Sequence, residues 1–195
     1  RELYERGLNL ATGLIALGVE ARDHIGLLAD NRLEWIVADA AVQLCGAADV
    51  PRGTDITEAE IRYILEHADA RVTFVENAAT LEKLRRSGIE GLRYVIVMDP
   101  AFPGADDALR LADVEAQGKA LRDAGDRRAE ERTAGIRPGD RFTLIYTSGT
   151  TGTPKGVQLT HANMVSQIRN LPIELHGGDR ALSVLPISHS YARVF

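Results

Sequence analysis

The beginning of the chain alternates between two hydrophobic patterns. Residues 3–18 carry leucines at helical spacing and end at Gly18, which predicts a helix with a glycine at its C-cap. The next apolar run, HIGLLA at residues 24–29, is short and continuous, as in a strand that is buried on both faces. A second helix is expected to begin at Asn31, a favourable N-cap residue, and to close at Gly46.

The same alternation continues downstream. An extended segment through Val50 and Pro51 leads to Thr57, and Glu60 three residues later completes the sequence pattern of a capping box. The helix predicted there is followed by two β-rich runs, RVTFVE and RYVIVM, with a short helix between them. Strands that alternate with helices at this spacing are typical of βαβ units. Residues 1–98 therefore predict an α/β fold with a mostly parallel sheet flanked by helices.

The pattern changes over residues 99–140. This stretch has a beginning rich in Pro and Gly, a charged helical run and a second Pro-Gly turn at residues 137–140. We expect a surface excursion with one solvated helix, whose charges form a wet face rather than a binding site. The strand pattern returns in RFTLIYT at residues 141–147. A helix in THANMVSQIRNL and a last apparent strand at residues 180–188 follow it.

Composition limits the class of protein. The chain has 195 residues, of which 45% are hydrophobic and 26% charged, which is ordinary for a globular protein. Its formal net charge of −5 argues against nucleic-acid binding, which needs clustered Lys and Arg. The single cysteine, Cys45, lies in an apolar stretch and is expected to be a buried, inert thiol in a reducing cytoplasm. No apolar run approaches the roughly 20 residues of a membrane-spanning helix.

The candidate chemistry lies in the loop that follows residues 141–147. The loop reads SGTTGTPKG, and its glycines let the backbone approach a ligand with N–H groups pointing at it. Neighbouring hydroxyl groups add donors, and Lys155 adds a mobile positive charge. A strand that delivers such a loop suits an anionic ligand such as a polyphosphate. The residues of this candidate phosphate site are Thr147, Ser148, Gly149, Thr150, Thr151, Gly152 and Lys155.

Two alternative interpretations of this loop fit less well. A flexible linker rarely follows a buried strand directly, and rarely ends in Pro-Lys-Gly. The P-loop of nucleotide triphosphatases requires G-x-x-x-x-G-K-[ST]. Counting from Gly149, the sixth position here is Pro154, and the residue after Lys155 is Gly156. The hydroxyl that would hold magnesium in a P-loop is therefore missing.

Three other side chains have candidate roles. Trp35 lies on the apolar face of its expected helix and is assigned to the core. His161 is expected to help cap the helix that begins near Thr160. Tyr146 could pack under the loop or touch a ligand, and the sequence does not decide between these roles.

Residues 144–155 resemble, without departure, the phosphate-loop signature of the adenylate-forming superfamily. That group includes acyl-CoA synthetases, luciferases and the adenylation domains of peptide synthetases. Upstream, NRLEW at residues 31–35 and the stretch IRYILEHADARVTFVE are similar to blocks of acyl-CoA synthetases. Downstream, LPISHSYARVF at residues 185–195 is most similar to the long-chain fatty acid members. The chain departs from the family pattern in two places: Arg52-Gly53 replaces Leu-Tyr, and Ala192 rather than Glu precedes Arg193.

The resemblance implies a reaction in two steps. The carboxylate of a fatty acid attacks the α-phosphate of ATP to give an acyl-adenylate and pyrophosphate, and the thiol of CoA then displaces AMP. It also implies that the loop grips the β- and γ-phosphates, that Thr147 is a ligand of Mg²⁺, and that His189 lies beside the acyl carboxylate or the adenylate. Other hypotheses stay open: a ligase for aryl or amino acids, a carrier-protein thiol as acceptor, or a non-catalytic nucleotide-binding module.

The same resemblance predicts how the chain is organised. It starts at Arg1 and stops at Phe195 inside a recognisable block, so we expect the N-terminal part of the AMP-binding large domain. Residues 1–98 would be its βαβ region, 99–140 the surface excursion, and 141–195 the phosphate-loop strand, the helix and the start of the acyl-pocket block. The family's adenine-binding block and catalytic Lys would lie downstream, so this piece alone is expected to be inactive. A sheet cut in mid-domain exposes strand edges, so the piece could dimerise. The parent is expected in the cytoplasm, without a transmembrane segment but with room for peripheral membrane contact.

Overall fold

The computed structural model describes residues 1–147 and 153–170, together with residues 176, 178, 180, 182, 184–189 and 193. The described residues form a sheet of seven strands in the order β5-β4-β3-β1-β2-β6-β7, and only β7 runs antiparallel to its neighbour. This is the mostly parallel α/β sheet that the sequence predicts. The strands are β1 (His24–Leu28), β2 (Ala48–Arg52), β3 (Val72–Val75), β4 (Tyr94–Val97), β5 (Leu109–Arg110), β6 (Arg141–Thr147) and β7 (Lys155–Thr160).

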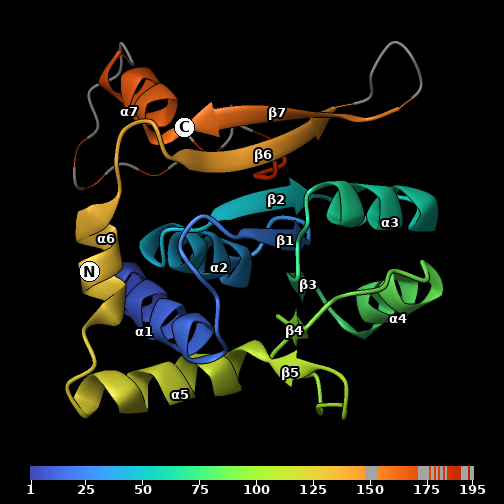
Figure 1. The fold of residues 1–195 in the computed structure, drawn as a ribbon, viewed down its shortest axis with the longest axis horizontal. Helices are drawn as coiled ribbons and strands as arrows, with labels where there is room; N and C mark the ends of the chain where they lie inside the picture. The colour runs from blue at the N-terminus through green and yellow to red at the C-terminus, as the bar shows by residue number, and fades with distance from the viewer. Residues whose placement is uncertain are drawn as a thin grey trace.

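Helices cover the sheet on both faces (Figure 1). On one face, α1, α2 and α5 enclose an apolar core with Trp35, Ile25 and Phe74, which confirms Trp35 as a core residue. On the other face, α3 and α4 enclose a second core that includes Ile61 and Tyr146. The helices are α1 (Glu2–Ala16), α2 (Leu33–Leu44), α3 (Glu58–His67), α4 (Ala78–Arg86), α5 (Leu111–Asp123), α6 (Arg128–Gly135) and α7 (His161–Arg169).

Local signals set several helix boundaries. The Thr57 side chain accepts from the Glu60 amide, and the Glu60 carboxylate accepts from the Thr57 amide, which is the capping box expected at the start of α3. The prediction for α2 was wrong at its start, because Arg32 occupies the N-cap and makes no side-chain cap. The Asn31 amide is used elsewhere, in contacts with Leu185 and Ile187 described below.

The prediction of one solvated helix between residues 99 and 140 was also wrong. This stretch contains two helices, α5 and α6, and α5 packs closely along α1 (Figure 1). Leu111, Val114 and Gly118 form a buried stripe at helical spacing, while Lys119 and Asp123 of the same helix are exposed. At the crossing, the missing side chain of Gly118 lets α5 approach the backbone of α1, since an added Cβ would lie 1.8 Å from the carbonyl oxygen of Asn9.

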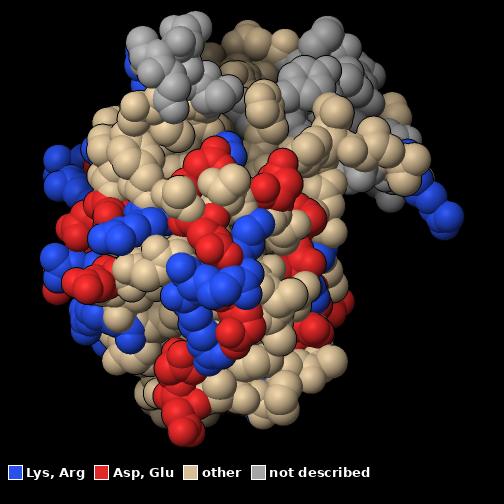
Figure 2. All heavy atoms as spheres, turned by 90° about the vertical axis from the view of Figure 1, so that its right-hand side faces the viewer, with Lys and Arg blue, Asp and Glu red and all other residues tan. Residues whose placement is uncertain are grey.

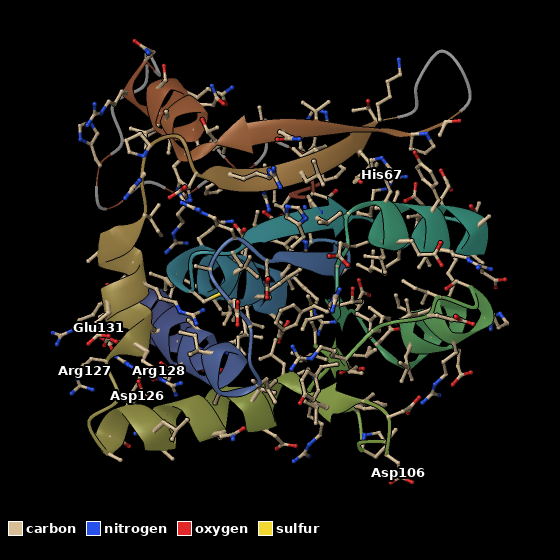
Figure 3. All side chains as sticks on the ribbon, viewed as in Figure 1. His67, Asp106, Asp126, Arg127, Arg128 and Glu131 are labelled. Atoms are coloured by element: carbon tan, nitrogen blue, oxygen red, sulfur yellow. The ribbon has the colours of Figure 1, made fainter. Side chains whose placement is uncertain are left out.

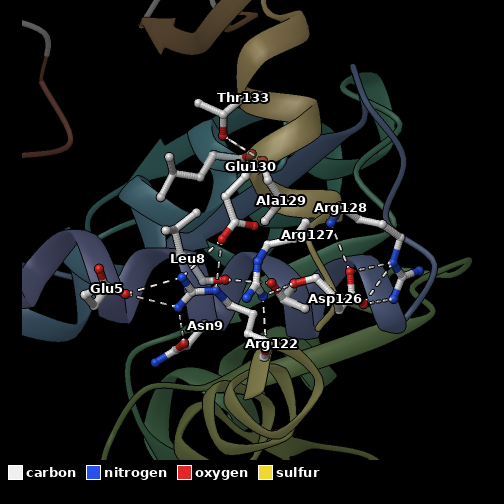
Figure 4. Close-up of polar contacts among 12 residues, drawn as sticks. Glu5, Leu8, Asn9, Arg122, Asp126, Arg127, Arg128, Ala129, Glu130 and Thr133 are labelled. Carbon is white, nitrogen blue, oxygen red and sulfur yellow. Dashed lines mark hydrogen bonds and ion pairs between the residues drawn. The ribbon is translucent and has the colours of Figure 1, made fainter. Parts of the chain in front are cut away.

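A polar cluster ties α5 and α6 to α1 (Figure 4). The Arg122 guanidinium donates to the Asn9 side chain at 2.6 Å and pairs with Glu5 at 3.2 Å and Glu130 at 3.2 Å. One side chain therefore joins three helices. Arg122 is therefore a structural residue. The charge pattern of this stretch predicts a solvated face because it does not show that such a charge has partners on neighbouring helices.

The last part of the chain differs from prediction in two places. β7 returns antiparallel to β6 after the loop and was not among the predicted strands. The strand expected at residues 180–188 is absent from the part of this segment that the structure describes, where residues 185–189 form bends and turns. Leu182 and Val184, two of the apolar residues that suggested a strand, are largely exposed there. The helix after the loop is confirmed as α7, capped by Thr160 and Asn163 rather than by His161.

The exposed charges are interleaved on the face that carries α3 and α4. Figure 2 shows Lys and Arg beside Asp and Glu across this face, and ion pairs such as Arg62–Glu66 and Arg86–Glu58 account for several of them. In the part of the chain that the structure describes, no helix has the length and apolar character to cross a membrane.

We predict that Gly118→Ala destabilises the protein by about 1–3 kcal/mol or more, because its methyl group would collide with the α1 backbone. On a solvated helix the same change would instead stabilise by about 0.5–1 kcal/mol. Urea unfolding of the variant beside the wild type measures the sign. Gly135→Ala on α6 is the control, since nothing lies within 4 Å of its added Cβ. A gain in stability for Gly118→Ala would refute the close packing of α5 on α1.

Candidate functional site

A cavity of about 740 Å³ opens where β1, β2 and β6 end. These strands are parallel neighbours, so their carboxyl ends meet at one edge of the sheet, where ligands of open α/β sheets commonly bind. Its described walls come from the segment after β1, the end of β2, the end of β6 and the turn at residues 185–189. The lining residues are Asp30, Pro51, Arg52, Gly53, Asp55, Ile145, Tyr146, Thr147, Leu185, Pro186, Ser188 and His189.

Two of the predicted phosphate-site residues flank the loop as a pair. Thr147 is the last residue of β6, Lys155 is the first of β7, and the two are register partners in the hairpin. Both are exposed, and Thr147 lines the cavity. The other predicted members, Ser148, Gly149, Thr150, Thr151 and Gly152, lie outside the described residues.

Aromatic side chains from α3 lie beneath the β6–β7 hairpin. His67 lies between α3 and β6 (Figure 3), and its Nδ1 is 2.6 Å from the Tyr146 hydroxyl. Tyr63 stacks on His67 with ring centroids 5.4 Å apart, and its hydroxyl donates to the Pro154 carbonyl at 3.2 Å. Burial raises the pKa of Tyr146 to about 12, so its hydroxyl keeps its proton at neutral pH. The Tyr146 side chain thus packs against α3 beneath the hairpin, and Tyr146 is also one of the residues that line the cavity.

Arg52 lies in one of the two places that depart from the family pattern. Its guanidinium donates to the Tyr146 carbonyl at 3.2 Å and lies 3.9 Å from the Glu60 carboxylate. Arg52 therefore braces the end of β6 against β2 and the start of α3, at the wall of the cavity. Arg52 thus gives the cavity wall a positive charge at a place where the family pattern, Leu-Tyr, has uncharged side chains.

His189, the predicted acyl-pocket residue, shares the cavity with Thr147. It lies in an exposed turn whose amide donates to the Pro186 carbonyl at 2.9 Å. Asn31 holds this turn, since its side chain donates to the Leu185 carbonyl and accepts from the Ile187 amide, each at 2.8 Å. Sequence reasoning assigned Asn31 to a helix cap and so missed that it fastens the wall that carries His189.

A buried cluster of charges anchors the same C-terminal segment. Arg193, with 4% of its side chain exposed, pairs with Asp39 at 3.1 Å and with Asp49, which is fully buried. The guanidinium also lies 4.8 Å from the centre of the Trp35 ring. Burial raises the pKa of Asp39 to about 6, with the nearby Asp49 adding to the shift and Arg193 opposing it. In the sequence, this cluster is signalled only by two aspartates, Asp39 and Asp49, that lie within otherwise apolar runs.

The remaining chemistry of the described chain is sparse. Cys45 is buried and its pKa is raised to about 12 by burial, which confirms the expected inert thiol. Among the described residues, no group of three or more His, Cys, Asp or Glu side chains is arranged to hold a metal ion. The cavity at the strand ends is therefore the candidate functional site.

We predict that Asp39 makes stability fall as pH rises from about 4 to about 6. The unfolded chain loses this proton near pH 4, whereas the folded protein keeps it up to a pKa of about 6, so the folded state binds more protons in between. The loss amounts to roughly 2–3 kcal/mol, and Asp39→Asn removes it. Urea unfolding of wild type and variant at pH 4 to 7 tests this, with the exposed Asp123→Asn as control. Parallel pH profiles for wild type and Asp39→Asn would contradict it.

Known proteins with similar sequences are acyl-activating enzymes. Long-chain-fatty-acid–CoA ligase FadD15 of Mycobacterium tuberculosis is 36% identical over 189 residues, which cover 94% of this chain and 30% of that protein. Probable acyl-activating enzyme 16, chloroplastic, of Arabidopsis thaliana is 34% identical over 206 residues, which cover 99% of this chain and 28% of that protein. The chain thus spans about 30% of the length of these curated relatives.

The fold is shared with solved structures of the same kind. A long-chain-fatty-acid-CoA ligase, FadD1 of Archaeoglobus fulgidus, superimposes with a TM-score of 0.78 at 24% identity, over 99% of this chain and 36% of that chain. The family model described as AMP-binding enzyme matches residues 1–195, which is the whole chain. These similarities show that the chain belongs to the AMP-binding enzyme family and is similar to long-chain fatty acid–CoA ligases of that family.

Proposed function

We propose that the complete protein activates a long-chain fatty acid with ATP and transfers the acyl group to CoA. One observation carries the proposal: the cavity brings the end of the phosphate-loop strand, Thr147, together with His189 of the acyl-pocket block. A site for adenylation must hold a polyphosphate and a carboxylate within one space, and these two residues lie on its walls. The fatty-acid class rests on similarity to relatives such as the long-chain-fatty-acid–CoA ligase FadD15.

The cavity suits ATP in size and in the character of its walls. Its volume of about 740 Å³ lies within the range of about 300–1,000 Å³ that is usual for small-molecule sites. Thr147 contributes a hydroxyl, Arg52 a cation, and Pro51 and Ile145 apolar surface. Lys155, beside Thr147 across the hairpin, would neutralise the pyrophosphate that leaves.

Mg²⁺ fits the same site through one protein ligand. A hydroxyl is the hard oxygen donor that Mg²⁺ accepts, and substrate phosphates commonly supply further oxygens, so Thr147 would hold the ion together with ATP. The ion would supply neutralisation of phosphate charge during adenylation.

The chain's own residues would act by positioning and by charge. The loop of residues 147–155 would direct backbone N–H groups and hydroxyls to the β- and γ-phosphates, which leaves the α-phosphate open to the carboxylate. A carboxylate oxygen forms the new bond to the α-phosphorus as the bond to pyrophosphate breaks. The CoA thiol then releases its proton to solvent, and its sulfur bonds to the acyl carbon as AMP leaves with the bonding electron pair. His189 would contact the carboxylate or the adenylate from the wall formed by the turn at residues 185–189.

The proposal extends to where the protein acts. We infer a cytoplasmic enzyme of small-molecule substrates that binds no nucleic acid. The formal net charge of −5 and the interleaved charges on the face shown in Figure 2 argue against nucleic-acid binding. A long-chain fatty acid partitions into membranes, so peripheral membrane contact is compatible with this proposal.

We predict that Lys155→Ala lowers the adenylation rate of the complete protein by roughly 10²-fold or more, because a charge that stabilises the leaving pyrophosphate is lost. Lys155 is exposed, so the melting temperature should stay unchanged. Stopped-flow or exchange kinetics measure the rate. Lys119→Ala on α5 removes an equally exposed lysine far from the cavity, paired with Asp123, and serves as control. Unchanged adenylation by Lys155→Ala would rule out the assigned role of the loop.

ATP–pyrophosphate exchange by the protein from its complete reading frame tests the activity. We expect exchange that depends on a long-chain fatty acid when short, medium and long acids are compared with aryl and amino acids. Exchange with another acid class would keep the adenylation and overturn the fatty-acid assignment. Absence of exchange with every acid would refute the proposal. Offering CoA and a carrier-protein thiol to the loaded enzyme then identifies the acceptor.

A further inference from the structure

We propose that Tyr63 and His67 of α3 are positioning residues that place Lys155 beside Thr147 at the cavity. The inference rests on the proposed function, because it assigns these side chains to the adenylation half-reaction. Neither side chain lines the cavity, and both would act through the β6–β7 hairpin.

Tyr63 reaches the strand that begins with Lys155. Its hydroxyl donates to the carbonyl of Pro154 at 3.2 Å, and Pro154 is bonded directly to Lys155. The contact joins residues that are 91 positions apart in the chain, so it links two separate elements, α3 and β7. Because the donor is a phenol hydroxyl on a helix, the bond sets the position of the Pro154 carbonyl relative to α3.

His67 reaches the opposite strand of the hairpin. Its Nδ1 lies 2.6 Å from the hydroxyl of Tyr146, the residue before Thr147. His67 follows Tyr63 by four residues, so both side chains project from one face of α3. The two rings are stacked, and each meets the Tyr146 ring edge-on, at 6.5 Å from Tyr63 and 5.7 Å from His67. One face of α3 thus holds both strand ends.

The Tyr146 ring transmits this support to Lys155. Tyr146 and Gly156 are register partners, and a Cβ on Gly156 would lie 3.2 Å from the Tyr146 ring and 3.0 Å from Leu144. The ring therefore lies directly against the backbone next to Lys155. A side chain at residue 156 would push β7 away from this ring, which gives the glycine a packing reason.

α3 is itself a firm support. Its start is capped by Thr57 and Glu60, and Ile61, Ile64 and Leu65 are buried in the core beneath it. Arg52 adds a bond to the Tyr146 carbonyl from the adjacent strand. Small displacements of a positioned charge carry large kinetic costs, so a helix anchored in the core is suited to hold Lys155 in place.

The test compares Tyr63→Phe and His67→Leu with wild type in the complete protein. We expect each to raise the KM for ATP in exchange, and the Kd for MgATP in calorimetry, by about 3- to 10-fold. The KM for the acid should stay within about twofold, because the wall that carries His189 is held by Asn31, not by α3. His67→Asn keeps a polar atom near the place of Nδ1 and should restore much of the ATP affinity. Tyr94→Phe is the matched control, since β3, β1 and β2 separate β4 from β6.

Each outcome decides between the inference and the proposed function. Normal exchange with an unchanged KM and Kd for ATP in Tyr63→Phe would overturn the inference and leave the function standing. Parallel rises in the KM of ATP and of the acid, with a lowered melting temperature, would show a merely structural role and also overturn it. Wild type that binds MgATP but performs no exchange would refute the function, and the Kd values would still judge the inference. Wild type without MgATP binding would overturn both.

Discussion

Parallel pairing of β2 with both β1 and β6 is the constraint on which the site depends. β2 pairs with β1 along its whole length and meets β6 at Asp49 and Thr143, whose hydroxyl donates to the Asp49 carbonyl at 3.3 Å. Parallel strands end at a common edge, so the segments that follow them are brought together without being neighbours in sequence. The cavity walls formed by Asp30, Gly53 and Thr147 are the direct result.

The two helical layers support different walls of that cavity. On one face, α3 lies under the β6–β7 hairpin and contacts both strand ends through aromatic side chains. On the other face, Asn31 before α2 and the aspartates of α2 and β2 hold the segment that carries His189. The wall with Thr147 and the wall with His189 therefore rest on separate cores, so each can be altered with limited effect on the other.

The buried charges around Arg193 lower the stability of the fold but fix the place where this residue binds. Removing Asp39, Asp49 and Arg193 from water is unfavourable, and the raised pKa of Asp39 records that cost. A charged segment docks only where its partners lie, whereas apolar contacts tolerate sliding. The cluster therefore fixes the position of Arg193 against α2 and β2, at some expense of stability.

The sequence by itself determined the α/β class, most strands and helices, the α3 capping box and the phosphate-loop signature. Each of these is local, because burial on both faces, helical spacing and cap chemistry are written in neighbouring residues. Only the tertiary structure decided the packing of α5, the return of β7, the use of Asn31 and the union of Thr147 with His189. Those depend on which distant groups meet: Gly118 matters through the α1 backbone, and Asn31 caps nothing because a turn more than 150 residues away occupies its amide. A local sequence pattern contains no information about these distant partners, because they become neighbours only when the chain folds.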